Sequence, residues 1–208
     1  MPRFLRVSTL AALALAATAL TAQAQEKQVG LLLGANFATL NGSDYVSDGA
    51  GTRTGFVGGL FVAIPLGGGN WFLEPEVLYS MQGDTYDNSA YNGTDALDYI
   101  RIPVLIKWVA NPGAKGFYVM AGPSVGFNVK CNDSGDAVGG GSYDEDCSDF
   151  GVKALTVFSG DLGAGYSFGR FSIEGRYNFD WSDAVELDDG TAVDVKNSVI
   201  SAIVRITK

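Results

Sequence analysis

The sequence predicts an all-β protein, an eight-stranded antiparallel up-and-down transmembrane β-barrel that follows an N-terminal signal peptide. Three observations predict this fold. Eight stretches alternate between apolar and polar side chains, the connections between them are alternately long and short, and the polar faces of several stretches carry ionised residues. A membrane barrel turns its apolar faces to lipid and its charged faces into a packed lumen. A soluble sandwich would bury the apolar faces instead. The rest of the sequence therefore has to distinguish a membrane barrel from a soluble sandwich.

Residues 1–24 have the properties of a secretory signal peptide. Arg3 and Arg6 precede an apolar run from Val7 to Leu20, and a small-residue cleavage site follows at 22–24. The run is too short for a membrane anchor and is followed at once by the cleavage site. We therefore expect an exported protein in which residues 25–208 form one barrel domain.

Composition excludes several classes of function. The 208 residues include 14 Lys and Arg against 23 Asp and Glu, a formal net charge of −9, and no histidine. Nucleic acid is an improbable partner, because binding it requires a basic surface. Small outer-membrane enzymes use histidine as a base, and catalytic zinc sites use imidazole ligands. We therefore expect no enzyme activity, no cofactor and no metal.

The expected strands and their connections define the topology. The strands are expected at 28–40, 54–64, 70–82, 96–110, 116–130, 152–166, 169–181 and 196–207. Short connections occupy 66–69, 111–114 and 167–169, and long polar ones occupy 41–53, 83–95, 131–151 and 182–195. Outer-membrane barrels have short periplasmic turns and longer extracellular loops. An even strand number also places both ends of the barrel chain on the periplasmic side.

The stretch from Tyr99 to Trp108 shows the alternation most clearly. One face carries Ile100, Ile102, Val104, Ile106 and Trp108, and the other carries Tyr99, Arg101, Pro103, Leu105 and Lys107. The expected strands at 70–82 and 169–181 show the same division. An eight-stranded barrel is just wide enough for side chains to fill. We therefore predict a plug of ion pairs in the lumen, formed by Glu74, Glu76, Arg101, Lys107, Asp161, Glu174 and Arg176, with the two glutamates of strand three beside Arg101 and Lys107.

Aromatic residues gather near the two ends of the strands. Trp71, Trp108 and Phe171 lie at the short-turn end, and Tyr79, Phe179 and Trp181 lie near the long loops. Amphipathic aromatic side chains prefer the two headgroup layers of a membrane. These six residues are therefore predicted to form an aromatic girdle.

The connection at 131–151 contains both cysteines and many acidic residues. Cys131 and Cys147 are expected to pair in an oxidising compartment, with free thiols as the alternative. The acidic residues could hold calcium, but their spacing matches no known loop, so a solvated acidic loop is expected. Pro75, Pro103 and Pro123 stand inside expected strands, where each removes a hydrogen-bond donor, and they predict bulges or kinks.

Three segments resemble a known family. Tyr99–Lys107, Trp71–Ser80 and Gly122–Gly126 are similar to strands of the small outer-membrane β-barrels of Bacteroidetes-type bacteria, often labelled porin family or PorT-like. The chain resembles the eight-stranded OmpX and OmpA barrels more distantly. The resemblance implies the barrel fold and the outer membrane, and it says little about activity.

The expected function is therefore a structural or surface-binding role in the outer membrane, carried by four long extracellular loops. The expected partners are outer-membrane lipid, lipopolysaccharide and a surface ligand or partner protein, and the protein is expected to be a monomer. A narrow channel is the first alternative. A secreted lipocalin-like carrier is the second, although the Gly-x-Trp motif of that family is missing from 30–37.

Overall fold

The computed structural model describes residues 27–45, 49–67, 69–112 and 115–208. The predicted signal peptide at 1–24 lies outside these residues. Within the described chain, no helix has the length and apolar character needed to cross a membrane.

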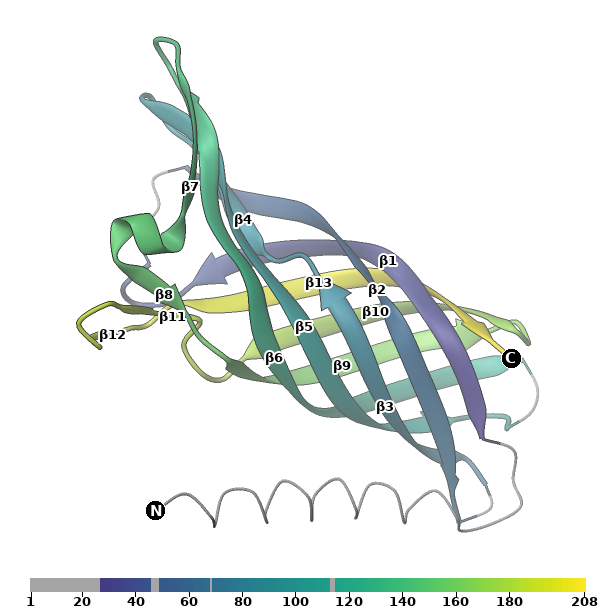
Figure 1. Cartoon of the computed structure of the whole chain (residues 1–208). Coiled ribbons are helices and arrows are strands. Elements are labelled where there is room, and N and C mark those ends of the chain that lie inside the picture. The colour runs from purple at the N-terminus through teal and green to yellow at the C-terminus, as the bar shows by residue number, and fades with distance from the viewer. Residues whose placement is uncertain (1–26, 46–48, 68, 113–114) are drawn as a thin grey trace, which may run out of the picture.

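Eight strands form a closed ring, which confirms the predicted fold (Figure 1). They are β1 (Gln28–Asn41), β2 (Ala50–Leu66), β3 (Trp71–Ser80), β5 (Tyr91–Val109), β6 (Gly116–Ala137), β9 (Val157–Ser167), β10 (Phe171–Asp180) and β13 (Lys196–Thr207). Each strand pairs antiparallel with the next strand of the ring. The ring closes where β1 pairs with β13, from Gly30 opposite Thr207 to Asn41 opposite Lys196.

The alternation in the sequence sets which side chains face outward. On β13, Ile200 is 60% exposed and Val204 is 49% exposed, whereas Arg205 is 1% exposed. The interior holds an apolar cluster of Leu32, Val57, Phe61, Leu78 and Ile203 together with many buried charged groups. The outward apolar surface and the charged interior fit a membrane barrel, and they do not fit the secreted-carrier alternative.

Two of the long connections are largely strand, which corrects the expectation of loops at 83–95 and 131–151. β4 (Gly83–Asp87) pairs with the first part of β5, and β6 continues past the ring to pair with β7 (Ser142–Asp146). These segments form a sheet that projects beyond the ring (Figure 1). Continued strand pairing gives hydrogen-bond partners to backbone groups that would contact water in a loop. The sequence alternation does not reveal β4 and β7 because both faces of these strands are polar.

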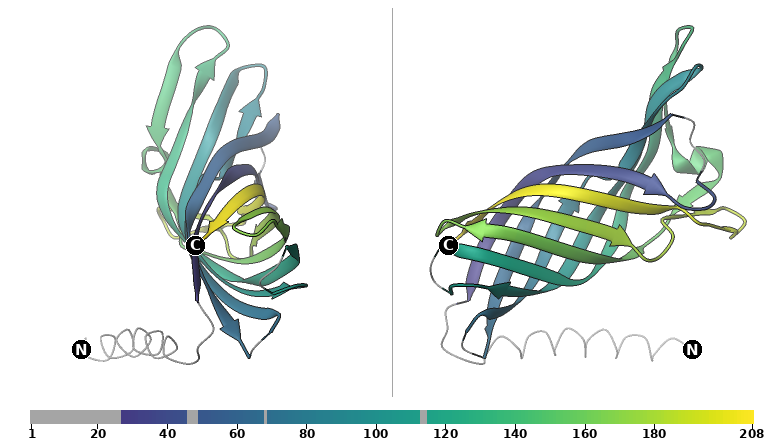
Figure 2. Two further views of the ribbon diagram at one scale, coloured as in Figure 1. Left: turned by 90° about the vertical axis from the view of Figure 1, so that its right-hand side faces the viewer. Right: turned by 180° about the vertical axis from the view of Figure 1, so that it is seen from behind.

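The remaining segments at this end of the ring are short. A 3-10 helix, η2 (Cys147–Phe150), follows β7, and β8 (Val152–Ala154), β11 (Val185–Leu187) and β12 (Ala192–Val193) form a small second sheet. The strand expected at 152–166 is therefore divided between β8 and β9. Figure 2 shows that the projecting sheet lies at the end of the barrel away from the C-terminus.

Of the bulges or kinks predicted at the strand prolines, the bulges are absent, and kinks stay a prediction. The register on either side of Pro75, Pro103 and Pro123 is the same, and the ladders only skip pairs beside these prolines, where a donor is missing. The pairing of β5 with β6 shifts instead between Asp98 and Tyr99.

Candidate functional site

The lumen is crossed by an ion-pair cluster centred on Glu76 of β3. Arg176 of β10 holds this carboxylate with two bonds, Nη1 to Oε2 at 2.6 Å and Nη2 to Oε1 at 3.0 Å. Arg205 of β13 reaches the same carboxylate at 3.2 Å. The bidentate arrangement is the strongest form of a guanidinium–carboxylate pair. It joins opposite walls of the barrel.

Arg205 also connects the two remaining glutamates of this cluster. Its Nη1 lies 2.7 Å from Oε2 of Glu174, and its Nη2 binds Glu74. Lys107 donates to Glu74 at 3.2 Å, and the Tyr118 hydroxyl donates to Glu174 at 3.1 Å. The guanidinium lies over the ring of Phe61, 4.0 Å from its centroid. Every charge in the cluster therefore has an opposite charge within contact.

We call Glu74, Glu76, Glu174, Lys107, Arg176 and Arg205 the lumen cluster. Their side chains are 0–12% exposed, so water contributes little to their solvation. The cluster contains as many carboxylates as cations, and burial of charge is tolerated only with such pairing and hydrogen bonding. Chemically, this arrangement stabilises and fills the lumen; the carboxylates are engaged with cations and are not free to act as an acid and a base.

A second group of polar contacts lies nearer the long loops. Arg101 binds Asp180 of β10 at 2.8 Å, the Ser159 hydroxyl at 2.5 Å and the Gln82 amide oxygen at 2.8 Å. Arg53 of β2 lies 2.7 Å from Asp98. These contacts form a second layer of charge pairs across the lumen.

The structure places the predicted lumen residues in different groups. Glu74, Glu76, Glu174, Arg176 and Lys107 come together. The expected partnership of Arg101 with the strand-three glutamates is wrong, because the stagger of the strands brings Asp180 to it instead. Asp161 accepts a hydrogen bond from Asn178 at 3.1 Å.

Sequence reasoning missed four charged residues that complete these groups: Arg205 and Asp180, and the pair formed by Arg53 and Asp98. Arg205 contacts all three glutamates of the lumen cluster, and Asp180 pairs with Arg101. Both occupy inward positions of the alternation, as the neighbouring outward Val204 and Phe179 imply. Strict use of that period-two pattern on the last strand could have found Arg205.

The six predicted girdle residues lie in two groups on the outer wall. Trp71 stands directly opposite Trp108 on the paired strands β3 and β5, and Phe171 is 57% exposed. At the other end, Tyr79 is 37% exposed and Trp181 is 57% exposed, and the rings of Phe179 and Trp181 meet edge to face. Their placement in the headgroup layers stays a prediction.

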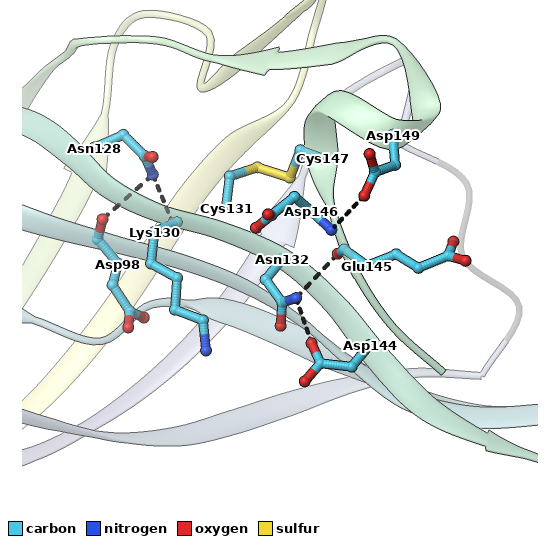
Figure 3. The surroundings of a disulfide bond; sticks show 10 residues. All are labelled: Asp98, Asn128, Lys130, Cys131, Asn132, Asp144, Glu145, Asp146, Cys147 and Asp149. Carbon is cyan, nitrogen blue, oxygen red and sulfur yellow. Dashed lines mark hydrogen bonds between the residues drawn. A yellow bond between two sulfur atoms is a disulfide. The ribbon is translucent and has the colours of Figure 1, made fainter. Parts of the chain in front are cut away.

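The projecting sheet is fastened at its base by a disulfide between Cys131 and Cys147, whose Cα atoms are 5.4 Å apart (Figure 3). Beside it, the Asn132 amide donates to Asp144 at 2.6 Å and to the Glu145 carbonyl at 3.0 Å.

In the described part of the chain, no group of three or more His, Cys, Asp or Glu residues is arranged to hold a metal ion.

Comparisons with solved structures find several membrane barrels. Ail, the attachment invasion locus protein of Yersinia pestis, is 14% identical, with a TM-score of 0.48 over 88% of this chain and 100% of that chain. Neisserial surface protein A is 16% identical, with a TM-score of 0.48 over 88% and 99%. The N-terminal barrel of Pseudomonas aeruginosa OprF is 12% identical, with a TM-score of 0.35 over 88% and 100%.

A comparison with curated proteins finds no match. A family model described as "Outer membrane protein beta-barrel domain" matches residues 22–183. This match covers most of the ring, from β1 through β10. The chain therefore belongs to the family of outer membrane protein beta-barrel domains.

Proposed function

We propose that the protein is a non-enzymatic scaffold of the outer membrane, with a closed lumen and a surface-binding role for its projecting sheet and outer loops. The observation that carries this proposal is the lumen cluster. Glu74 and Glu76 are 0% and 1% exposed, and Arg176 and Arg205 connect them to the far wall. Ions would have to displace these pairs to cross the barrel.

The alternative of a narrow channel requires a continuous water path along the same axis. The second layer of contacts argues against such a path, because Arg101 and Asp180 are 3% and 0% exposed at the level of their side chains. Two layers of paired charges then stand in series in the lumen. Each pair would have to open for conduction.

Planar-bilayer recording of the full barrel tests this choice. We expect no discrete openings from the wild-type protein, and we expect the same for a variant at an exposed turn residue, Arg170→Gln. Conductance steps in the wild type that vanish when Lys107 is changed to Met would establish the channel instead. A heated and unheated gel of each sample confirms that the barrel is folded.

The binding role is supported by the surface of the outer segments. Asp144, Glu145 and Asp146 of β7 are exposed, as are Asp136 and Asp149 beside them. We propose that this acidic surface meets lipopolysaccharide through bridging divalent cations, as well as a surface ligand or partner protein. The protein is proposed to act as a monomer, with residues 1–24 removed on export.

Nanodiscs with and without lipopolysaccharide test the lipid contact. The unfolding midpoint of the barrel should rise with lipopolysaccharide only when magnesium is present, because the bridging cation links two acidic surfaces. Neutralising Asp144 and Glu145 as Asn and Gln should remove the magnesium dependence. A rise that is independent of magnesium would contradict the bridging contact.

A further inference from the structure

Three aspartates lie side by side at the root of the projecting sheet. Asp84 of β4 is paired directly with Asp95 of β5, and Asp95 is paired directly with Asp133 of β6. Directly opposite residues of antiparallel strands share a face and lie close together, and like charges in these positions repel. The row lies in the projecting sheet, past the end of β3 at Ser80. Its arrangement requires something that relieves the repulsion.

Asp84 is the most enclosed member of this row. It is 0% exposed, its Oδ2 accepts a hydrogen bond from the Tyr45 hydroxyl, and its Oδ1 is buried without a hydrogen-bond partner among the described residues. Asp95 stands directly opposite Asp84 on the paired strands, so the two carboxyl groups lie side by side on one face. Two carboxylates in contact cannot both stay ionised at low cost. A proton on Asp95 supplies a donor to Asp84.

The groups that face this pair do not neutralise it. Asp133 accepts a hydrogen bond from the Tyr86 hydroxyl at 2.5 Å, and that hydroxyl also contacts the hydroxyl of Tyr143 on β7. Glu145 of β7 is paired with Asp133 and adds a further negative charge to the row. On the barrel side, Arg53 of β2 is already bound to Asp98 at 2.7 Å. Apart from Arg53, which is engaged with Asp98, these facing groups are neutral or negative.

We propose that Asp84 and Asp95 form a proton-binding pair that fastens the β4–β5 hairpin to the rim of the barrel. With one proton bound, the pair holds the two strands together. When the proton leaves, two adjacent carboxylates repel and the projecting sheet loosens at its root. The degree of order of this surface then follows the pH outside the cell.

The electrostatics support this geometry. Burial raises the pKa of Asp84 to about 6. Burial also raises the pKa of Asp95 to about 7, and the negative charges of Asp133 and Asp84 add to the effect. In an opened hairpin both groups would titrate near the ordinary value of about 4. The closed hairpin therefore holds protons more tightly than the open one, so closure is most favourable at low pH and weakens as pH rises through this interval.

Hydrogen exchange of the full barrel in nanodiscs tests the proposal. The reporters are three amides of the projecting sheet: Leu97, which donates to the Gln82 carbonyl at 3.0 Å, Asp87, which donates to Gly49 at 3.1 Å, and Asn88, which donates to Tyr91 at 2.9 Å. After correction for intrinsic exchange, their opening constant should rise by about tenfold per pH unit for each proton released on opening, between about pH 5 and about pH 7. Amides of the ring should not change.

Two matched variants separate the pair from the general acidity of the sheet. Asp95→Asn keeps a donor beside Asp84 at every pH, so its reporters should stay protected throughout. Asp87→Asn removes an exposed carboxylate from the same strand and should behave as the wild type. Carbon-13 titration of the wild-type aspartate carboxyls gives a second readout that needs no variant, and it should show a group titrating well above the ordinary range.

Three outcomes would overturn the proposal. The first is a wild-type opening constant that does not change with pH. The second is a pH dependence that survives in Asp95→Asn. The third is recovery of protection by calcium at about pH 8, which would show that the row binds a metal ion in place of a proton. None of these results depends on which ligand the outer surface binds, so the test is separate from that of the proposed function.

Discussion

Replacing Arg205 with methionine removes the residue that contacts all three glutamates of the lumen cluster. The guanidinium is 1% exposed and makes three ion pairs, with Glu74, with Glu76 at 3.2 Å and with Glu174 at 2.7 Å. Methionine retains much of the aliphatic volume and has no charge. The variant therefore tests the ion pairs with little change in packing.

The magnitude follows from what remains after the substitution. Glu76 keeps Arg176, and Glu74 keeps Lys107, so no carboxylate loses every partner. The buried cluster nevertheless acquires one uncompensated negative charge. Loss of one partner from a buried pair costs about 3–5 kcal/mol. We expect the free energy of unfolding of Arg205→Met to fall by that amount.

Urea unfolding in lipid vesicles, followed by tryptophan fluorescence, measures this difference. The matched control is Arg170→Met, at an exposed turn residue, and it should change stability by less than about 0.5 kcal/mol. Adding Glu74→Gln to Arg205→Met restores equal numbers of positive and negative charges, and should recover about 1–2 kcal/mol. A loss below about 1 kcal/mol for Arg205→Met, or a double variant less stable than the single one, would refute the charge-balance reasoning.

Three further predictions concern other parts of the molecule. Arg101→Met leaves Asp180 buried and should lower stability by about 3–5 kcal/mol in the same urea assay; an unchanged midpoint would show that this layer contributes nothing. Gly165→Val should lower the free energy of unfolding by about 1–3 kcal/mol, because a Cβ there would lie 2.4 Å from the Tyr118 ring. The control for added bulk is Gly169→Ala, at a position with open space; its positive φ adds backbone strain. Changing both cysteines to Ser should speed hydrogen exchange in β7 and leave the heat-dependent gel shift of the barrel intact; exchange equal to the wild type would contradict a role for the disulfide in ordering the sheet.

The alternation of side chains was enough to predict the ring and its inward faces. Glu74 and Glu76 on one strand, and Glu174 and Arg176 on another, stand at inward positions because a strand has a period of two. The same period places Trp71 and Trp181 outward, where they are 52% and 57% exposed. These properties are local, so they can be read from neighbouring residues without knowledge of the partner strands.

In the projecting sheet, the alternation of side chains does not predict the structure. β4 and β7 are polar on both faces, and their pairing partners are chosen by the course of the neighbouring strands. Without a buried apolar face, register leaves little trace in a sequence. The aspartate row at the root of the sheet therefore becomes visible only when β4, β5 and β6 are placed side by side.

The sequence by itself determined the fold class, the number of strands in the ring and the inward face of the strands at 70–82, 96–110 and 169–181, because each follows from short-range periodicity and from the lengths of the connections. Only the tertiary structure decided which charges meet. Arg176 and Arg205 bind Glu76 although they are 100 and 129 residues away in the sequence, and Arg101 binds Asp180 at a separation of 79 residues. The stagger of the strands around the ring brings these residues together, because it sets the height of each side chain in the lumen. No pattern within a single strand indicates that stagger.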